Sequence, residues 1–337
     1  MKKIYIFIVL VLFATLEISA QTYVADVSKK GTTAAPFLSI GQGAKAASMG
    51  SAFVAVADDP SAMYWNPSGL ANLSGVNVLF DHTEWFAGIR FNYVGITYSL
   101  GDFGNIGASF TASDIGEMNV TTINEPEGTG EVFKVNDVAF SIAYALKLTD
   151  NFSIGINPKF ISQSIWRMNA TGIALDMGVQ YVTPFDGAVL AMSIANFGSR
   201  MQLTGNSALK VIQMGTNDKV PAYLQTEEWA LPLNFRVGIA YQPLKTQMHK
   251  LTLAVDAMHP NDNYESVNAG AEYLFNDFVA FRGGYNSLFL KDSEQSFTLG
   301  FGLKQQILGN IAVKLDYAFE KFGRLNNIQK FTLGINF

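Results

Sequence analysis

Long stretches of strict alternation between apolar and polar residues constrain this fold most. In segment 327–337, Phe331, Leu333, Ile335 and Phe337 share one face, and the residues between them are polar or small. A period of two residues predicts a β-strand with one apolar face. Most such segments are about 10–12 residues long, against about 5–6 for an average strand and about 9–11 for a tilted membrane-spanning strand. The alternation therefore favours a membrane β-barrel.

The connections between the segments support the same architecture. Every second connection is short, whereas the two longest, 115–133 and 198–231, fall in the opposite set. Bacterial outer-membrane barrels have short periplasmic turns and long outer loops. We therefore expect an all-β membrane protein, an antiparallel barrel of about fourteen strands, with both termini on the periplasmic side. The expected strands are 76–85, 89–100, 104–114, 134–147, 152–165, 170–182, 187–197, 232–242, 249–258, 264–274, 278–287, 295–304, 310–320 and 327–337.

Charged side chains indicate which face of each strand points outward. In the last seven expected strands, ten charged residues lie on the face opposite the aromatic one. A register slip of one residue would turn all of them toward lipid, where each Arg or Lys costs about 2–4 kcal/mol at mid-membrane. The sum would exceed a typical net stability of about 5–15 kcal/mol. We expect these side chains in the lumen: Arg236, Lys250, Asp256, Glu272, Arg282, Lys304, Lys314, Asp316, Glu320 and Lys330.

The N-terminus has the pattern of an export signal. Lys2 and Lys3 precede an apolar run at 4–16, and the small residues Ser19 and Ala20 follow it. The run is too short for a membrane-spanning helix, and the three-part pattern is typical of a cleaved signal peptide. We expect a signal peptide at 1–20, a hatch or plug with short helical segments at 21–75, and a barrel at 76–337 in the outer membrane of a Gram-negative cell.

Composition argues against several classes of function. The net charge is −5 and only 15% of residues are charged, so no basic surface for nucleic acid is evident. With 0 Cys and 3 His, none of them in metal-binding spacing, we expect no metal site and no cofactor. The carboxylates at 58–59 are a weak calcium signal without further ligands. No GxSxG motif accompanies His259 with Ser266 or Ser287, so we expect no enzyme activity and no catalytic residues.

Four short motifs precede the first expected strand: Gly43-Ala44-Lys45-Ala46, Ser48-Met49-Gly50, Ala55-Val56-Ala57-Asp58-Asp59 and Tyr64-Trp65-Asn66-Pro67. Together they resemble the hatch of FadL-type outer-membrane barrels, and most of all the PorV/PorQ branch of that superfamily. The terminal Phe337 fits the C-terminal assembly signal of such barrels. One departure is Ser68, where many relatives have Ala.

The resemblance implies a folded N-terminal hatch within the barrel. It also implies an accessory role in type IX protein secretion. The partners would then be secreted proteins with C-terminal sorting domains and a large translocon barrel. Relatives of FadL take up hydrophobic molecules instead, which leaves a hydrophobic ligand as the alternative.

The hatch motifs supply the candidate gate or ligand contacts. Glycines permit positive φ and close approach of backbones, and the run 66–69 is a turn sequence. The adjacent aspartates are suited to capping amides or pairing with lumen cations, and the tryptophan to wedging against the wall. A purely structural plug remains the alternative for each candidate: Gly43, Ser48, Met49, Gly50, Asp58, Asp59, Trp65, Asn66 and Pro67.

Two strand irregularities are candidate kinks or lateral openings in the wall. The apolar phase changes between Tyr93 and Ile96, which predicts a β-bulge at Val94 and Gly95. Pro158 falls within a strand, where it cannot donate a ladder hydrogen bond. FadL-type barrels use a strand kink as a lateral opening to the membrane. Simple curvature of the wall is the alternative.

Three functions remain open. The first is an accessory barrel of type IX secretion that binds exported cargo or the translocon through its outer loops. The second is a FadL-like transporter of hydrophobic small molecules, and the third is a structural barrel or general porin. Trp229, in the longest expected loop, is a candidate partner contact. The resemblance favours the first function.

Overall fold

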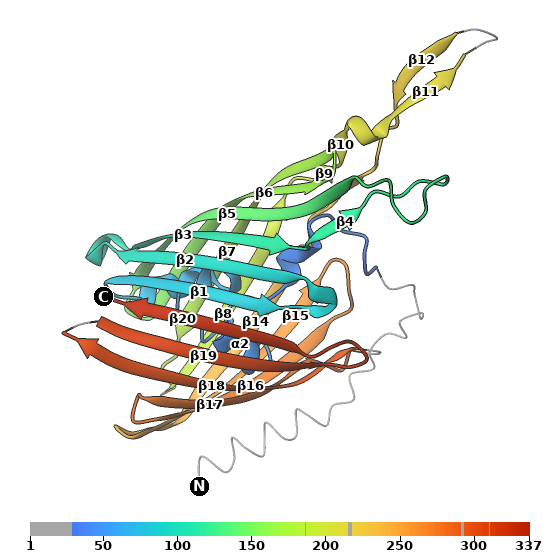
Figure 1. The fold of residues 1–337 in the computed structure, drawn as a ribbon. Helices are drawn as coiled ribbons and strands as arrows, with labels where there is room; N and C mark the ends of the chain where they lie inside the picture. The colour runs from blue at the N-terminus through green and yellow to red at the C-terminus, as the bar shows by residue number, and fades with distance from the viewer. Residues whose placement is uncertain (1–28, 186, 215–217, 291–292, 310) are drawn as a thin grey trace, which may run out of the picture.

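The computed structural model describes residues 29–337 apart from 186, 215–217, 291–292 and 310. The expected signal peptide, 1–20, lies outside the described residues. Fourteen antiparallel strands close into a barrel (Figure 1). The first strand pairs with the last, and β8 pairs with β14 across the longest connection. The barrel strands are β1 (Val76–Glu84), β2 (Arg90–Ser99), β3 (Asn105–Asp114), β5 (Val132–Thr149), β6 (Phe152–Ile165), β7 (Met168–Val182), β8 (Ala188–Gly198), β14 (Asn234–Lys245), β15 (His249–Pro260), β16 (Ser266–Phe275), β17 (Val279–Leu288), β18 (Gln295–Leu308), β19 (Ile311–Phe322) and β20 (Ile328–Asn336).

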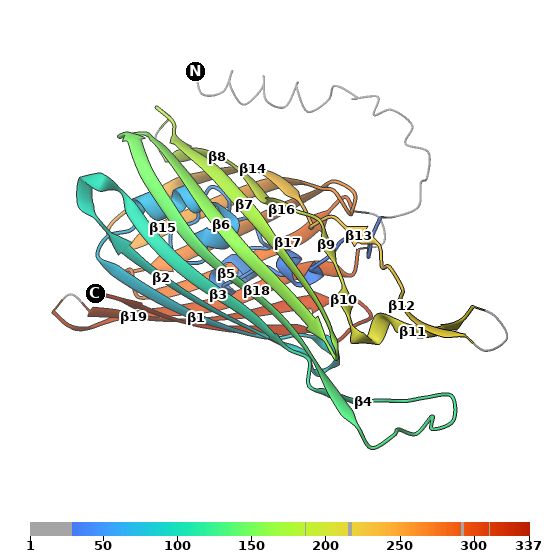
Figure 2. The ribbon, with the colours of Figure 1, turned by 90° about the horizontal axis from the view of Figure 1, so that it is seen from above.

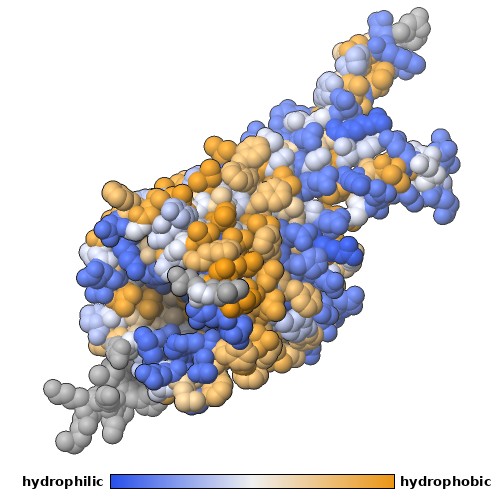
Figure 3. Space-filling model, turned by 60° about the vertical axis from the view of Figure 1, so that its left-hand side comes forward, coloured by the Kyte–Doolittle hydropathy of each residue, from blue (hydrophilic) through white to orange (hydrophobic). Residues whose placement is uncertain are grey.

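The expected strands are confirmed, with ends that differ by a few residues at most. The outer wall is apolar, with Phe80, Phe140 and Phe281 among its exposed side chains, and Figure 3 shows this hydrophobic surface. The ten charged residues expected in the lumen do face it: nine line internal cavities, and Asp256 bonds to backbone inside the barrel. No helix in the described ranges is long and apolar enough to cross a membrane.

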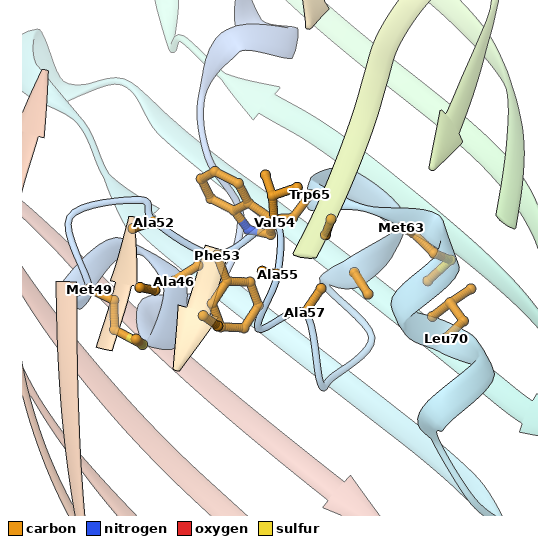
Figure 4. Packing of buried hydrophobic residues seen from close by; sticks show 14 of the residues in the cluster. Ala46, Met49, Ala52, Phe53, Val54, Ala55, Ala57, Met63, Trp65 and Leu70 are labelled. Carbon is orange, nitrogen blue, oxygen red and sulfur yellow. The ribbon is translucent and has the colours of Figure 1, made fainter. Parts of the chain in front are cut away.

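Residues 29–75, here called the lumenal segment, pack inside this barrel (Figure 2). Short helical segments were expected within 21–75, and the first α-helix has only five residues, because turns follow at once. A cluster of buried side chains surrounds Phe53 and Trp65 at the centre (Figure 4). The elements of the segment are η1 (Pro36–Ser39), α2 (Ala44–Ser48), α3 (Ala62–Trp65) and η2 (Pro67–Asn72).

The start of the lumenal segment corrects the expectation that the N-terminal side of the chain, like its C-terminus, lies at the periplasmic end of the barrel. The amide of Ala34 donates to the carbonyl of Ala230 at 2.8 Å, and Thr33 donates to Asp262 at 3.1 Å. Both partners lie in connections at the long-loop end, whereas Phe337 lies at the short-turn end, beside Val76. The even number of strands places the beginning of β1 at the short-turn end. It does not place the residues before β1, because these run through the lumen from the long-loop end.

The long-loop end carries structure beyond the barrel. A hairpin of β11 (Leu209–Gln213) and β12 (Lys219–Tyr223) projects away from the wall (Figures 1 and 2). The connection after β3 projects from the same end and includes β4 (Glu117–Asn119). The other short elements are η3 (Phe86–Gly88), η4 (Gly101–Phe103), β9 (Met201–Gln202), β10 (Thr204–Gly205), η5 (Asn206–Ala208) and β13 (Glu228–Trp229).

The expected bulge at Val94 and Gly95 is wrong. β2 pairs with β1 and β3 in one unbroken register through both residues. Tyr93 points inward and donates to the carbonyl of Pro60 at 2.9 Å, whereas Ile96 points outward. The apolar phase changes because Phe91 and Tyr93 face inward against the lumenal segment, whereas the apolar residues from Val94 onward face outward.

Pro158 does coincide with an irregularity of the wall. Its side chain faces outward, and it remains paired with Leu175 on β7. Toward β5, pairing stops at Ser141–Lys159 and resumes at Tyr144–Ile156 without a change of register. The missing amide hydrogen of proline accounts for a local interruption of the ladder.

Candidate functional site

Glycines of the motif allow the lumenal segment to approach the wall. Gly43 has φ of 87° and donates to Asp81 Oδ2 at 3.0 Å. Gly50 has φ of 63° and donates to Thr298 Oγ1 at 2.9 Å. A Cβ at Gly50 would lie 2.6 Å from the backbone nitrogen of Tyr285. Only glycine suits both the conformation and the spacing.

Asn66 joins the lumenal segment to itself and to the wall. Its Nδ2 donates to the carbonyls of Val54 at 3.0 Å and Val179 at 3.2 Å. Its Oδ1 accepts from the amide of Ser68, which caps η2, and from the Ser68 hydroxyl. Pro67 follows as the first residue of η2, where its missing N–H costs nothing. Asn66 is fully buried, and its amide is fully used.

Ser48, Met49 and Trp65 belong to the packed interior. Ser48 donates to the carbonyl of Lys45 at 2.8 Å, and Met49 is fully buried. Trp65 packs edge-on against Phe53, and its Nε1 donates to the carbonyl of Gln42 at 2.8 Å. These contacts hold the lumenal segment together.

The adjacent aspartates face different partners. Lys45 Nζ lies 2.8 Å from Asp58 and 3.4 Å from Glu272 of the wall. Burial alone would raise the pKa of Asp58, but the charges of Lys45 and Lys314 hold it below its usual range. Asp59 accepts from the amide and hydroxyl of Ser61. Burial and the neighbouring Asp58 charge raise the pKa of Asp59.

Several inward-facing side chains of the wall hold the segment without having been expected as site residues. Asp256 Oδ2 accepts from the amides of Phe53 at 2.7 Å and Val54 at 2.9 Å. Asn157 donates to the carbonyl of Met63, and Gln180 donates to that of Ala55. In the sequence, these residues could be found by their place on the lumen face of expected strands. A polar side chain buried there requires a hydrogen-bond partner.

Two cavities lie on opposite sides of the packed centre. The upper cavity, of about 230 Å³, opens at the long-loop end and is lined by Trp65, Arg236 and amide side chains. The lower cavity, of about 260 Å³, lies at the short-turn end and is lined by charged residues, among them Lys45 and Lys304. In the described part of the chain, the two cavities share no lining residue.

The remaining candidates do not line these cavities. Trp229 forms β13, pairs with Met201 of β9, and is 46% exposed at the long-loop end. Val94 and Pro158 lie on the outer face of the wall, whereas Gly95 faces inward, where a Cβ would lie 3.1 Å from Cε of Met63. The structure therefore brings together the motif residues of the lumenal segment, and of the wall and loop candidates only Gly95 faces this segment.

The comparisons decide the family. Residues 24–259 match the family described as the type IX secretion system protein PorV. The chain belongs to the PorV family. Its family and its fold are those of outer-membrane barrels, so the chain is an outer-membrane protein. No curated protein matches the chain.

Solved structures show the fold that this PorV-family chain shares. The CymD monoaromatic hydrocarbon channel aligns with a TM-score of 0.57 at 14% identity, over 88% of this chain and 96% of its own. The toluene transporter TodX of Pseudomonas putida aligns with a TM-score of 0.55 at 13% identity, over 88% and 97%. A FadL homologue of Pseudomonas aeruginosa gives 0.50 at 12% identity, over 88% and 98%. At such identities the likeness shows a FadL-like barrel and no more.

Proposed function

We propose that this chain serves type IX secretion as a plugged, non-catalytic barrel that binds proteins at its outer end. Its partners would be exported proteins with C-terminal sorting domains, a large translocon barrel, or both. The lumenal segment, residues 29–75, would act as the plug.

Exposed apolar side chains on the β11–β12 hairpin are the observation that carries this proposal. Val211 is 67% exposed, Met214 71% and Tyr223 64%, although the hairpin projects beyond the apolar wall that faces lipid. In water, such a surface marks a protein contact. Trp229 and Ile123 add exposed apolar side chains at the same end. The filled lumen fits a binding protein better than an open channel.

Transport of a hydrophobic molecule is the second candidate, and the interrupted ladder at Pro158 favours it. A lateral opening there would connect the lumen to the membrane. The charged and amide side chains around both cavities are poor neighbours for such a molecule, because burying their polar groups without partners costs free energy. Because of this polar lining, transport is a weaker candidate than the role in secretion.

Purification of the tagged protein in mild detergent, followed by mass spectrometry, tests the proposal. Wild type should retain exported proteins that share a C-terminal domain, or a very large barrel. The double variant Val211→Ser/Tyr223→Ser should lose them. The matched control is Phe103→Ser/Phe185→Ser, which removes even more exposed apolar groups at the short-turn end and should retain the partners. A lone barrel with a bound hydrophobic molecule would contradict the proposal and support transport.

A further inference from the structure

The upper cavity holds a buried cation without an acidic partner. Arg236 is only 3% exposed, and its guanidinium lies 5.2 Å from the ring of Tyr64 and 5.3 Å from that of Trp65. Its Nη1 reaches the carbonyl of Tyr64 at 3.4 Å, and its Nε has no hydrogen-bond partner. Among the described residues, no carboxylate lies within 4.0 Å of it.

No neighbouring acid forms an ion pair with Arg236. Asp256, a diagonal neighbour of Arg236 across β14 and β15, uses Oδ2 to accept from two amides of the lumenal segment, and its Oδ1 is buried without a hydrogen bond. Glu320 lies 3.7 Å from Lys330, and Asp262 accepts from Thr33. A buried charge with no counter-charge in direct contact is costly, and an anion in the cavity beside the guanidinium would offset that cost.

Two acceptors in the same cavity also have no partner. Asn234 Oδ1 and Asn263 Oδ1 are buried without a hydrogen bond in the described structure. Both residues line the cavity beside Arg236. Carbonyl oxygens of this kind require a donor, and hydroxyl groups of a bound molecule would supply one. The side chains that line the cavity therefore lack one anion and at least two hydrogen-bond donors.

We propose that the upper cavity binds a small hydroxylated carboxylate, such as a sugar acid. The carboxylate lies against the Arg236 guanidinium, and hydroxyl groups donate to Asn234 and Asn263. A volume of about 230 Å³ suits a single small molecule rather than a folded partner. The site opens toward the cell surface and does not depend on the secretion role proposed above.

Fluorescence titration of the purified full chain tests this site, because Trp65 and Trp85 line the cavity. D-glucuronate should change the tryptophan emission saturably, and the uncharged D-glucose should bind at least tenfold more weakly. Arg236→Gln should weaken glucuronate binding at least tenfold, because it removes the charge-assisted contact. Arg236→Lys should weaken it less. Arg167→Gln, which changes an exposed arginine far from the cavity, should bind as wild type does.

Each variant is first checked for the heat-modifiable gel shift of a folded barrel. If Arg236→Gln does not fold, Asn234→Ala takes its place and should also weaken binding. Absence of glucuronate binding, or equal binding of glucuronate and glucose, would overturn the proposal. Tighter binding of N-acetyl-glycylglycine than of glucuronate would overturn it as well, because the cavity would then favour the end of a polypeptide chain.

Discussion

A single carboxylate of the wall, Asp256, holds the centre of the lumenal segment. Replacing Asp256 with Ala leaves the buried amides of Phe53 and Val54 without their acceptor. We expect a loss of about 2–5 kcal/mol in the free energy of unfolding, measured by the gel shift in urea. Asp277→Ala is the control, because it removes a half-exposed partner of Lys250 and should cost about 0–1 kcal/mol. Equal losses in the two variants would show that Asp256 is not an anchor.

The ion pair of Lys45 and Asp58 makes stability depend on pH. The pKa of Asp58 is lowered in the folded chain, so its contribution is present above the unfolded value of about 3.9 and is lost as the pH falls through the folded value. Asp58→Asn should therefore destabilise the protein at pH 7, and the difference between variant and wild type should shrink as the pH falls below the unfolded value. We expect a loss of about 1 kcal/mol or less in the free energy of unfolding, because half of the Asp58 side chain is exposed. The variant also removes the repulsion between the charges of Asp58 and Asp59, which reduces the loss further.

The measurement is the thermal midpoint of the gel shift for wild type and variant at several pH values. Lys45 remains charged throughout, because the Asp58 and Glu272 carboxylates overcome the effect of burial and raise its pKa. A difference between the two proteins that stays constant with pH would contradict the ion-pair explanation.

At the scale of the strand, a substitution of Pro158 tests whether the interrupted hydrogen-bond ladder has a role in secretion or uptake. Pro158→Thr supplies an amide that can donate toward β5, so the wall should become continuous and the folded yield should not fall. If a lateral opening matters, secretion or uptake should decrease in cells that carry this variant. Ile156→Thr is the control, because it changes another outward side chain of β6 but leaves the ladder intact. Unchanged function in Pro158→Thr would remove the lateral opening from consideration.

The strands could be predicted from sequence because each element carries its own signal. Alternation and inward charges place every barrel strand to within a few residues. The change of apolar phase in β2 does not predict a bulge, because Phe91 and Tyr93 face an apolar lumenal segment and no local pattern reveals what fills a lumen. Likewise, motif residues such as Asn66 were visible in sequence, but partners such as Asp256 depend on pairing across about 200 residues of chain.

At the scale of the whole molecule, a filled lumen predicts a closed barrel. Cavities at the two ends are separated by the buried cluster around Phe53 and share no lining residue among those described. Full-length protein in a planar bilayer should therefore carry no steady ion current. Deletion of residues 29–73 should produce stepwise currents, because barrels of sixteen to eighteen strands leave a channel and one of about fourteen has room for water once emptied.

Both proteins must first show the gel shift of a folded barrel. If the deletion does not fold, Asp256→Ala replaces it and should give brief openings, because its lumenal segment is held less firmly. Steady currents through the full-length protein, equal to those of the deletion, would show that residues 29–75 do not close the lumen. The barrel would then act as a porin, and the binding role at its outer end would have to stand on the partner experiment alone.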